Sequence, residues 1–145
     1  MQSKQENSSS PLNAEAAPLF LYEYSLVQFT PSVERGEVIN VGLLMMCKRR
    51  RWVRARIHIN EQLLHIIAPQ WDVEMLREQL ESFCLVADGT GDSPLASIEA
   101  HERFRWLTAV RSACITTSRP HPGRCSDLEI TFNRLFAKLV MRNQY

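Results

Sequence analysis

Apolar positions in the first half of the sequence follow strand periodicity. Residues 19–29 carry the aromatic and β-branched side chains typical of a strand. Residues 37–47 are apolar on both alternating faces, as in a central strand, except at Asn40 and Gly42. Residues 52–59 alternate strictly between apolar and polar, which indicates one buried face. This pattern predicts three strands in an antiparallel meander, the second and third forming a hairpin.

The second half of the sequence changes to helical periodicity. A fourth strand is predicted over 113–117, and the proline and glycine residues of 120–123 predict a loop. Ser126 with Glu129 fits a capping box at the start of the last helix. Apolar residues recur every three or four positions in four segments, 60–67, 72–87, 99–110 and 126–140. We therefore expect an α+β fold, in which a small antiparallel sheet (a three-stranded meander plus a fourth strand) packs against about four helices.

The polar start of the chain differs from the rest. Residues 1–18 are rich in Ser, Asn, Gln, Glu and Ala and have no periodicity, so they are expected to be a disordered lead-in. Residues 19–145 are then expected to form a single α+β domain, a length that can bury a sizeable core.

Charge and cysteine usage narrow the class of protein. A net charge of +1 gives no overall attraction to nucleic acid or to an anionic membrane. The first twenty residues lack the pattern of a secretory leader, and the sequence has no long apolar run that could cross a membrane. The four scattered cysteines are expected to be reduced thiols. These observations predict a soluble cytoplasmic protein without a membrane partner.

The first candidate site is the charged turn before the second strand. It contains Glu34, Arg35 and Glu37, and Asn40 follows inside the strand. Gly36 permits the positive φ of a sharp turn. One interpretation is a polar cleft in which a carboxylate binds a cation or acts as a base. The other, which we favour, is a solvated turn whose asparagine holds a neighbouring segment in place.

The second candidate site lies on and after the third predicted helix. Arg103 and Trp106 are three residues apart on this helix, and Arg111 and Ser112 follow its end. Arginines in this arrangement could hold a phosphate or carboxylate. They could equally pair with the acids of the turn at Glu34 to Glu37, which is the more common role.

The third candidate is the turn between the second and third strands. A ribbon of basic residues with an interleaved tryptophan could bind a phosphate backbone. It could also protect a sheet edge from aggregation, and the low net charge favours this interpretation, so a nucleic-acid partner is not expected. The basic residues are Lys48, Arg49, Arg50, Arg51, Arg54 and Arg56.

The last candidates are His121 and Cys125, spaced His-x-x-x-Cys. A zinc site needs a further pair of ligands at short spacing, and the other histidines and cysteines are isolated. No phosphate-binding glycine loop is present either. We therefore expect no metal and no cofactor.

Several of these segments, in this order, resemble the bacterial domain-of-unknown-function family 3037. The resemblance covers about residues 22–140. The segments that carry it are 24–27, 33–42, 102–107, Arg111 with Ser112, and 121–125.

The resemblance implies a small bacterial α+β protein with no established enzymatic activity. Genes of the family often lie beside those of HipA-like serine/threonine kinases, which implies a kinase-like partner. Our leading hypothesis is thus a non-catalytic interaction or regulatory module. The alternative is an enzyme or nucleic-acid-processing factor that uses Glu34 and Glu37 with Arg103, Arg111 and His121 on an anionic substrate.

Overall fold

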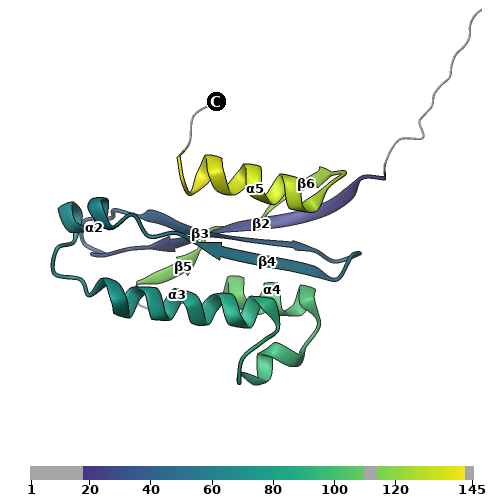
Figure 1. Cartoon of the computed structure of the whole chain (residues 1–145), viewed down its shortest axis with the longest axis horizontal. Coiled ribbons are helices and arrows are strands. Elements are labelled where there is room, and N and C mark those ends of the chain that lie inside the picture. The colour runs from purple at the N-terminus through teal and green to yellow at the C-terminus, as the bar shows by residue number, and fades with distance from the viewer. Residues whose placement is uncertain (1–17, 110–113, 143–145) are drawn as a thin grey trace, which may run out of the picture.

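Five strands form one sheet in which every pairing is antiparallel (Figure 1). The structure, a computed structural model, describes residues 18–109 and 114–142. The spatial order is β4-β3-β2-β5, and β6 also pairs with β2. The strands are β2 (Phe20–Phe29), β3 (Ile39–Cys47), β4 (Trp52–Ile57), β5 (Ile115–Thr117) and β6 (His121–Cys125). The α+β fold and the meander expected from the sequence are confirmed.

The fifth strand corrects the prediction of a four-stranded sheet. The expected loop at residues 120–123 instead runs into β6, which pairs with residues 20–24 of β2, while β5 pairs with residues 27–29. Pro122 is tolerated because β6 lies at the edge of the sheet. Gly123 is required because a Cβ there would lie 2.4 Å from Cζ of Tyr22 on the paired strand. The residues that signalled a loop are thus adaptations of an edge strand.

Helices cover both faces of the sheet (Figure 1). The long helix α3 and the shorter α4 lie under one face, and α5 lies alone over the other. The helices are α2 (Glu61–Ile67), α3 (Val73–Asp88), the 3-10 turn η2 (Pro94–Ser97), α4 (Ala100–Ala109) and α5 (Leu128–Leu139). The four predicted helices are confirmed.

The helix starts are fixed by side-chain caps. Asn60 accepts from the backbone N–H of Leu63, and Asp72 caps α3 in the same way. At α5 the cap is Asp127, whose side chain accepts from the N–H of Ile130, so the prediction of Ser126 was wrong by one residue. An aspartate satisfies the same exposed donors as a serine and also favours the positive end of the helix dipole.

A β-bulge in β3 decides which side chains face which helix. Val27 pairs with Gly42 but Gln28 pairs with Asn40, so Val41 is the extra residue. Gly42 is needed here because a Cβ would lie 2.9 Å from the carbonyl oxygen of Arg56 on β4. A glycine inside a strand indicates a bulge or a close backbone approach, and both occur at Gly42.

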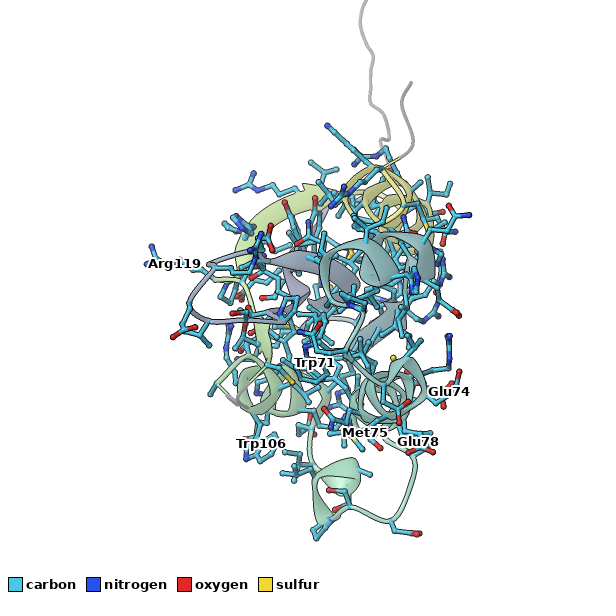
Figure 2. All side chains as sticks on the ribbon, turned by 90° about the vertical axis from the view of Figure 1, so that its left-hand side faces the viewer. Trp71, Glu74, Met75, Glu78, Trp106 and Arg119 are labelled. Atoms are coloured by element: carbon cyan, nitrogen blue, oxygen red, sulfur yellow. The ribbon has the colours of Figure 1, made fainter. Side chains whose placement is uncertain are left out.

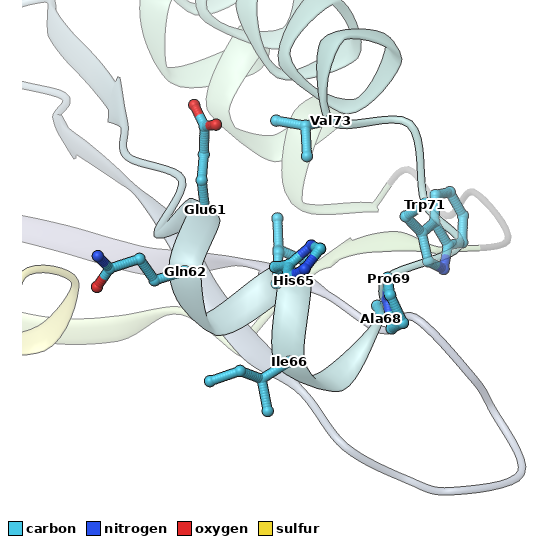
Figure 3. Close-up of a pocket in the computed structure, with 9 residues that line it drawn as sticks. Glu61, Gln62, His65, Ile66, Ala68, Pro69, Trp71 and Val73 are labelled. Carbon is cyan, nitrogen blue, oxygen red and sulfur yellow. The ribbon is translucent and has the colours of Figure 1, made fainter.

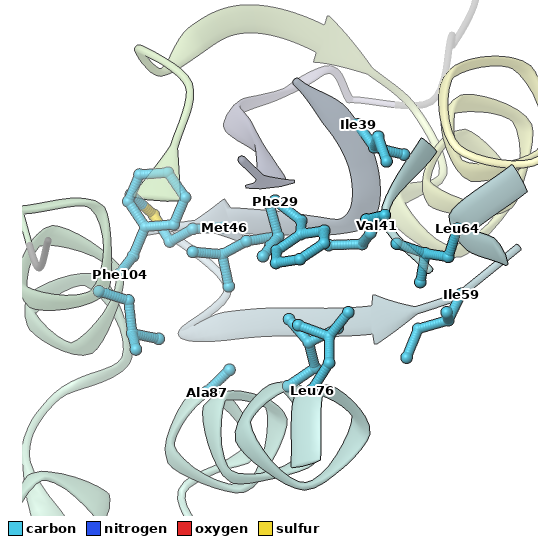
Figure 4. Packing of buried hydrophobic residues seen from close by; sticks show 14 residues of the cluster. Phe29, Ile39, Val41, Met46, Ile59, Leu64, Leu76, Ala87 and Phe104 are labelled. Atoms are coloured by element: carbon cyan, nitrogen blue, oxygen red, sulfur yellow. The ribbon is translucent and has the colours of Figure 1, made fainter. Parts of the chain in front are cut away.

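Two apolar clusters lie on opposite faces of the sheet. The larger contains Phe29, Leu76 and Phe104 and joins the sheet to α2, α3 and α4 (Figure 4). The smaller contains Phe132 and Leu43 and joins the sheet to α5. Because β3 contributes to both clusters, its continuous apolar sequence is explained.

Candidate functional site

The charged turn before β3 is largely exposed, and two of its three charges pair with each other. Nε of Arg35 donates to a carboxylate oxygen of Glu37 at 2.9 Å. This hydrogen bond lowers the pKa of Glu37, and Glu34 is exposed beside it. Gly36 has a φ of 70°, and its N–H donates to Ser32 and Val33 carbonyls, as the predicted sharp turn requires.

Asn40 holds the end of α5 against the sheet. Its Nδ2 donates to the carbonyl oxygen of Leu139 at 3.3 Å, and its Oδ1 accepts from Gln28 at 3.2 Å. The bulge turns Asn40 toward α5, where the last carbonyls of the helix need donors. This polar residue in a central strand therefore has a structural use.

Arg103 is also bound to backbone carbonyls. Its Nε donates to Ala87 at the end of α3 at 3.3 Å, and Nη1 donates to Ile98 after η2. Both acceptors lie at helix ends, where carbonyls lack intrahelical partners. Arg103 thus connects the ends of α3 and η2 to α4.

The turn and Arg103 lie at opposite ends of α3. The indole N–H of Trp71, just before α3, donates to the carbonyl of Pro31 beside the turn at 3.1 Å. Arg103 instead contacts Ala87, at the far end of this 16-residue helix. A helix of that length is about 24 Å long. The structure therefore does not bring Arg103 together with Glu34 and Glu37, and Arg111 and Ser112 lie outside the described residues.

His121 and Cys125 occupy the two ends of β6. Four residue steps along the strand separate their Cα atoms by about 13 Å. His121 stacks on Tyr24 with ring centroids 5.1 Å apart, and Cys125 packs against the α5 cluster. The two are therefore too far apart to act on one atom.

Some basic residues of the hairpin between β3 and β4 contact other side chains, and others are exposed at the turn. Arg54 makes a bidentate ion pair with Glu129 of α5 at 2.8 and 2.6 Å. The Arg56 guanidinium lies over the Phe132 ring, 5.1 Å from its centroid. The Arg50 guanidinium lies 5.1 Å from the centroid of Phe20. The exposed cations at the turn itself are Lys48, Arg49 and Arg51.

Trp106 projects beside an apolar groove that sequence reasoning did not find. Its side chain is 46% exposed, and Figure 2 places it on the helical layer that also carries Met75 and Glu78. The groove has a volume of about 240 Å³ and is open to solvent. The residues that line it are Gln79, Ser82, Phe83, Val86, Trp106, Leu107, Ile115, Thr116 and Thr117. They come from α3, α4 and β5, so no local sequence pattern could indicate it.

A second, larger hollow of about 600 Å³ lies beside α2 (Figure 3). Glu61, His65 and Trp71 line it with apolar neighbours, and Ile66 is 76% exposed at its border. The short α2 forms most of its wall. Its polar groups come from one helical turn and one loop, and they do not converge on a shared point in Figure 3.

The cysteines and the potential metal ligands of the described residues form no further candidate site. All four cysteines are free thiols, and burial raises the pKa of Cys84 to about 11, with Asp88 and Glu81 adding to the shift. Within residues 18–109 and 114–142, no group of three potential ligands is placed to hold a metal. The same residues contain no helix long and apolar enough to cross a membrane.

Comparison with known proteins gives one match. Residues 24–140 match the model of a family described as "Protein of unknown function (DUF3037)". No curated protein and no solved structure matches the chain.

Proposed function

The chain belongs to the DUF3037 family, and we propose that it is a non-catalytic interaction module that binds a partner protein through the groove between α3 and α4. The observation that carries this proposal is Trp106, which stays nearly half exposed beside an open apolar groove. Tryptophan is among the residues most enriched at the energetic centres of protein interfaces.

The groove has the dimensions of a receptor for one large side chain. Phe83, Val86 and Ile115 give it an apolar floor, and Trp106 forms one wall. Its volume of about 240 Å³ is below the range of sites for drug-sized ligands, about 300–1,000 Å³. A single apolar anchor residue of a partner would fill it.

The two helices that form the groove carry an excess of acidic side chains, which indicates the chemistry of the partner. Glu102 precedes Trp106 by four residues on α4, and Glu78 precedes Ser82 by four on α3, so each acid shares a side of its helix with a residue that lines the groove. Residues 73–109 contain seven carboxylates and only three arginines. Each of these arginines already bonds to a carboxylate or a carbonyl of the protein. The partner segment should therefore present an apolar anchor flanked by basic residues.

A HipA-like serine/threonine kinase is the partner we propose, on the basis of the family resemblance. The kinase would supply the basic segment with its apolar anchor. The geometry favours such binding over the enzymatic alternative, because Glu37, Asn40 and Arg103 each serve a local structural contact. A catalytic use would require breaking those contacts.

The proposal is tested by co-purification of the chain with a HipA-like kinase. Trp106→Ala should weaken capture of the kinase at least about tenfold, since loss of a central tryptophan typically costs about 2 kcal/mol or more. Glu102→Lys should also weaken it. The matched control is Ile130→Ala on α5, which removes an apolar side chain that is more exposed (66%) from the opposite face.

The experiment tests the identity of the partner and the position of the binding surface separately. If the wild-type chain does not bind the kinase, the proposed partner is wrong. If the kinase binds and Trp106→Ala binds it equally well, the groove is not the binding surface.

A further inference from the structure

Charges of opposite sign are segregated in this molecule. Residues 48–56, which form the hairpin turn and most of β4, contain six basic residues and no acid. Residues 73–109, the α3–α4 layer, contain seven acids and three arginines. The net charge of +1 is therefore an average over two oppositely charged regions, and it says little about either surface.

Three of the four cations at the hairpin turn form no ion pair with a described residue. Arg54 and Arg56 contact α5, and Arg50 covers Phe20. Lys48 and Arg49 are exposed and form no ion pair with any residue that the structure describes, and the same holds for Arg51. Three unpaired cations in four consecutive residues repel each other, a cost that an anionic partner would remove.

The turn presents these cations on a defined backbone. The N–H of Arg51 donates to the carbonyl of Lys48 at 3.1 Å, and the flanking Cys47 and Trp52 are paired across the hairpin. Arg51 has a φ of 50°, the left-handed conformation that a four-residue hairpin turn requires. A fixed turn loses less entropy on binding than a flexible basic tail would.

We propose that this hairpin turn binds the phosphate backbone of a nucleic acid, with Lys48, Arg49 and Arg51 as the contacting cations. This binding site goes beyond the proposed protein-binding groove and depends on none of the residues that form it. Arg134 and Lys138 of α5 are also exposed. Phosphate contacts by such cations supply most of the affinity of sequence-independent binding.

The aromatic residues beside the turn indicate backbone contact rather than base stacking. The Arg50 guanidinium covers Phe20, and the Arg54 guanidinium lies 5.6 Å from the centroid of the Trp52 ring. The Trp52 indole also packs edge-on against Phe132. Ring faces that are already covered cannot stack on bases, so binding should be independent of base sequence.

A nucleic acid fits this turn better than a membrane or an acidic protein. The four turn residues include no apolar side chain that could enter a lipid interface. The centre of a protein interface is normally depleted of charge, whereas this tip consists only of charges. A phosphate backbone needs no apolar complement.

The test is binding of the full chain to fluorescent 20-nucleotide single strands of dT and dA and to a duplex of equal length, with salt varied. The wild-type chain should bind at 50 mM salt with little preference between dT and dA. The variant Lys48→Ser, Arg49→Ser, Arg51→Asn uses asparagine because it tolerates the positive φ at Arg51. It should bind at least about tenfold more weakly, and the slope of log K against log salt should fall by about 2 to 3.

A matched variant removes the same charge elsewhere. Arg119→Ser, Arg124→Ser, Arg142→Asn replaces three exposed arginines outside the hairpin, with asparagine again at a positive φ. It should keep the wild-type slope to within about one unit. Equal losses in the two variants would overturn the assignment to the turn, and so would undetectable binding by the wild type. Binding to anionic phospholipid vesicles in place of nucleic acid would overturn the proposal in favour of a membrane surface.

Discussion

The two faces of the sheet are covered by different means. On the α3–α4 face, a continuous apolar cluster that includes Phe29, Leu80 and Phe104 holds two helices in place. On the α5 face the apolar cluster is smaller, and arginines reach across from β4 to the helix. One layer therefore depends mainly on apolar burial, while the other adds charged side chains at its border.

This difference follows from the number of helices on each face. A single helix cannot cover a twisted five-stranded sheet, so the borders of its apolar cluster need another cover. The Arg56 guanidinium lies over both Phe132 and Phe136, at 5.1 and 5.2 Å from the centroids. Long arginine stems can bury apolar surface while the charged head stays in water. The basic composition of β4 thus has a structural cause, whereas Lys48, Arg49 and Arg51 of the turn before it form no ion pair with a described residue.

The largest expected effect tests whether both faces depend on their central aromatic residue. Phe104→Ala and Phe132→Ala should each lower the free energy of unfolding by about 3–5 kcal/mol, because both rings are fully buried and their loss leaves cavities. Urea denaturation of the two variants measures this. A cost below about 1 kcal/mol for Phe132→Ala would contradict the packing of α5 described above.

A double-mutant cycle then measures the contribution of the cation–π contact between Arg56 and Phe132 on the α5 face. Arg56→Met combined with Phe132→Leu should show a coupling of about 0.5–1 kcal/mol, the usual size of a cation–π contact. The same Arg56→Met combined with Phe104→Leu should show none, because Phe104 lies on the opposite face.

A smaller loss of stability is expected from a substitution at Gly42, beside the bulge of the central strand β3. Gly42→Ala would place a Cβ 2.9 Å from a backbone oxygen of β4 and 3.2 Å from both Val27 and Ile57. We expect a loss of about 1–3 kcal/mol, because backbone must move to accept the methyl group. Gly91→Ala, at a left-handed glycine whose nearest contact is 3.6 Å, provides a comparison governed by backbone strain alone. Equal stability of Gly42→Ala and the wild type in urea would contradict the close approach.

Periodicity was sufficient to predict those strands and helices whose own sequence has a regular apolar pattern. It did not predict β6, because Pro122 and Gly123 are typical of loops. They fit a strand only at a sheet edge and only under the Tyr22 ring of the neighbouring strand. Such a fit depends on tertiary contacts that a local pattern does not contain.

Among the candidate site residues too, local contacts could be predicted from the sequence and tertiary contacts could not. The exposed turn with its positive-φ glycine could be predicted because Arg35 and Glu37 interact locally. The partners of Arg103 could not, because they are carbonyl oxygens at helix ends and any residue type supplies one. The groove beside Trp106 combines three elements distant in sequence, so its shape is a property of the fold alone.

The smallest expected effect concerns a bidentate ion pair between α4 and β2. Arg105 donates to both carboxylate oxygens of Glu23 at 2.7 and 2.6 Å, and this hydrogen bonding lowers the pKa of Glu23. A carboxyl with a lower pKa in the folded state stabilises the fold above its unfolded pKa, and this contribution is lost as the pH falls through the folded pKa. Because the pair is partly exposed to solvent, its contribution should be below about 1 kcal/mol.

Glu23→Gln should therefore be slightly less stable than the wild type at pH 7, and the difference should disappear as the pH falls below the ordinary range of a glutamate. Urea denaturation from pH 7 to pH 3 measures it, with Glu34→Gln as a control at an exposed carboxylate of the turn that forms no ion pair with the described residues. A difference that persists at pH 3 would mean that Glu23 acts through packing rather than through its charge. In that case the α3–α4 layer would depend on apolar contacts alone, and the contrast with the α5 face would be sharper than the ion pairs suggest.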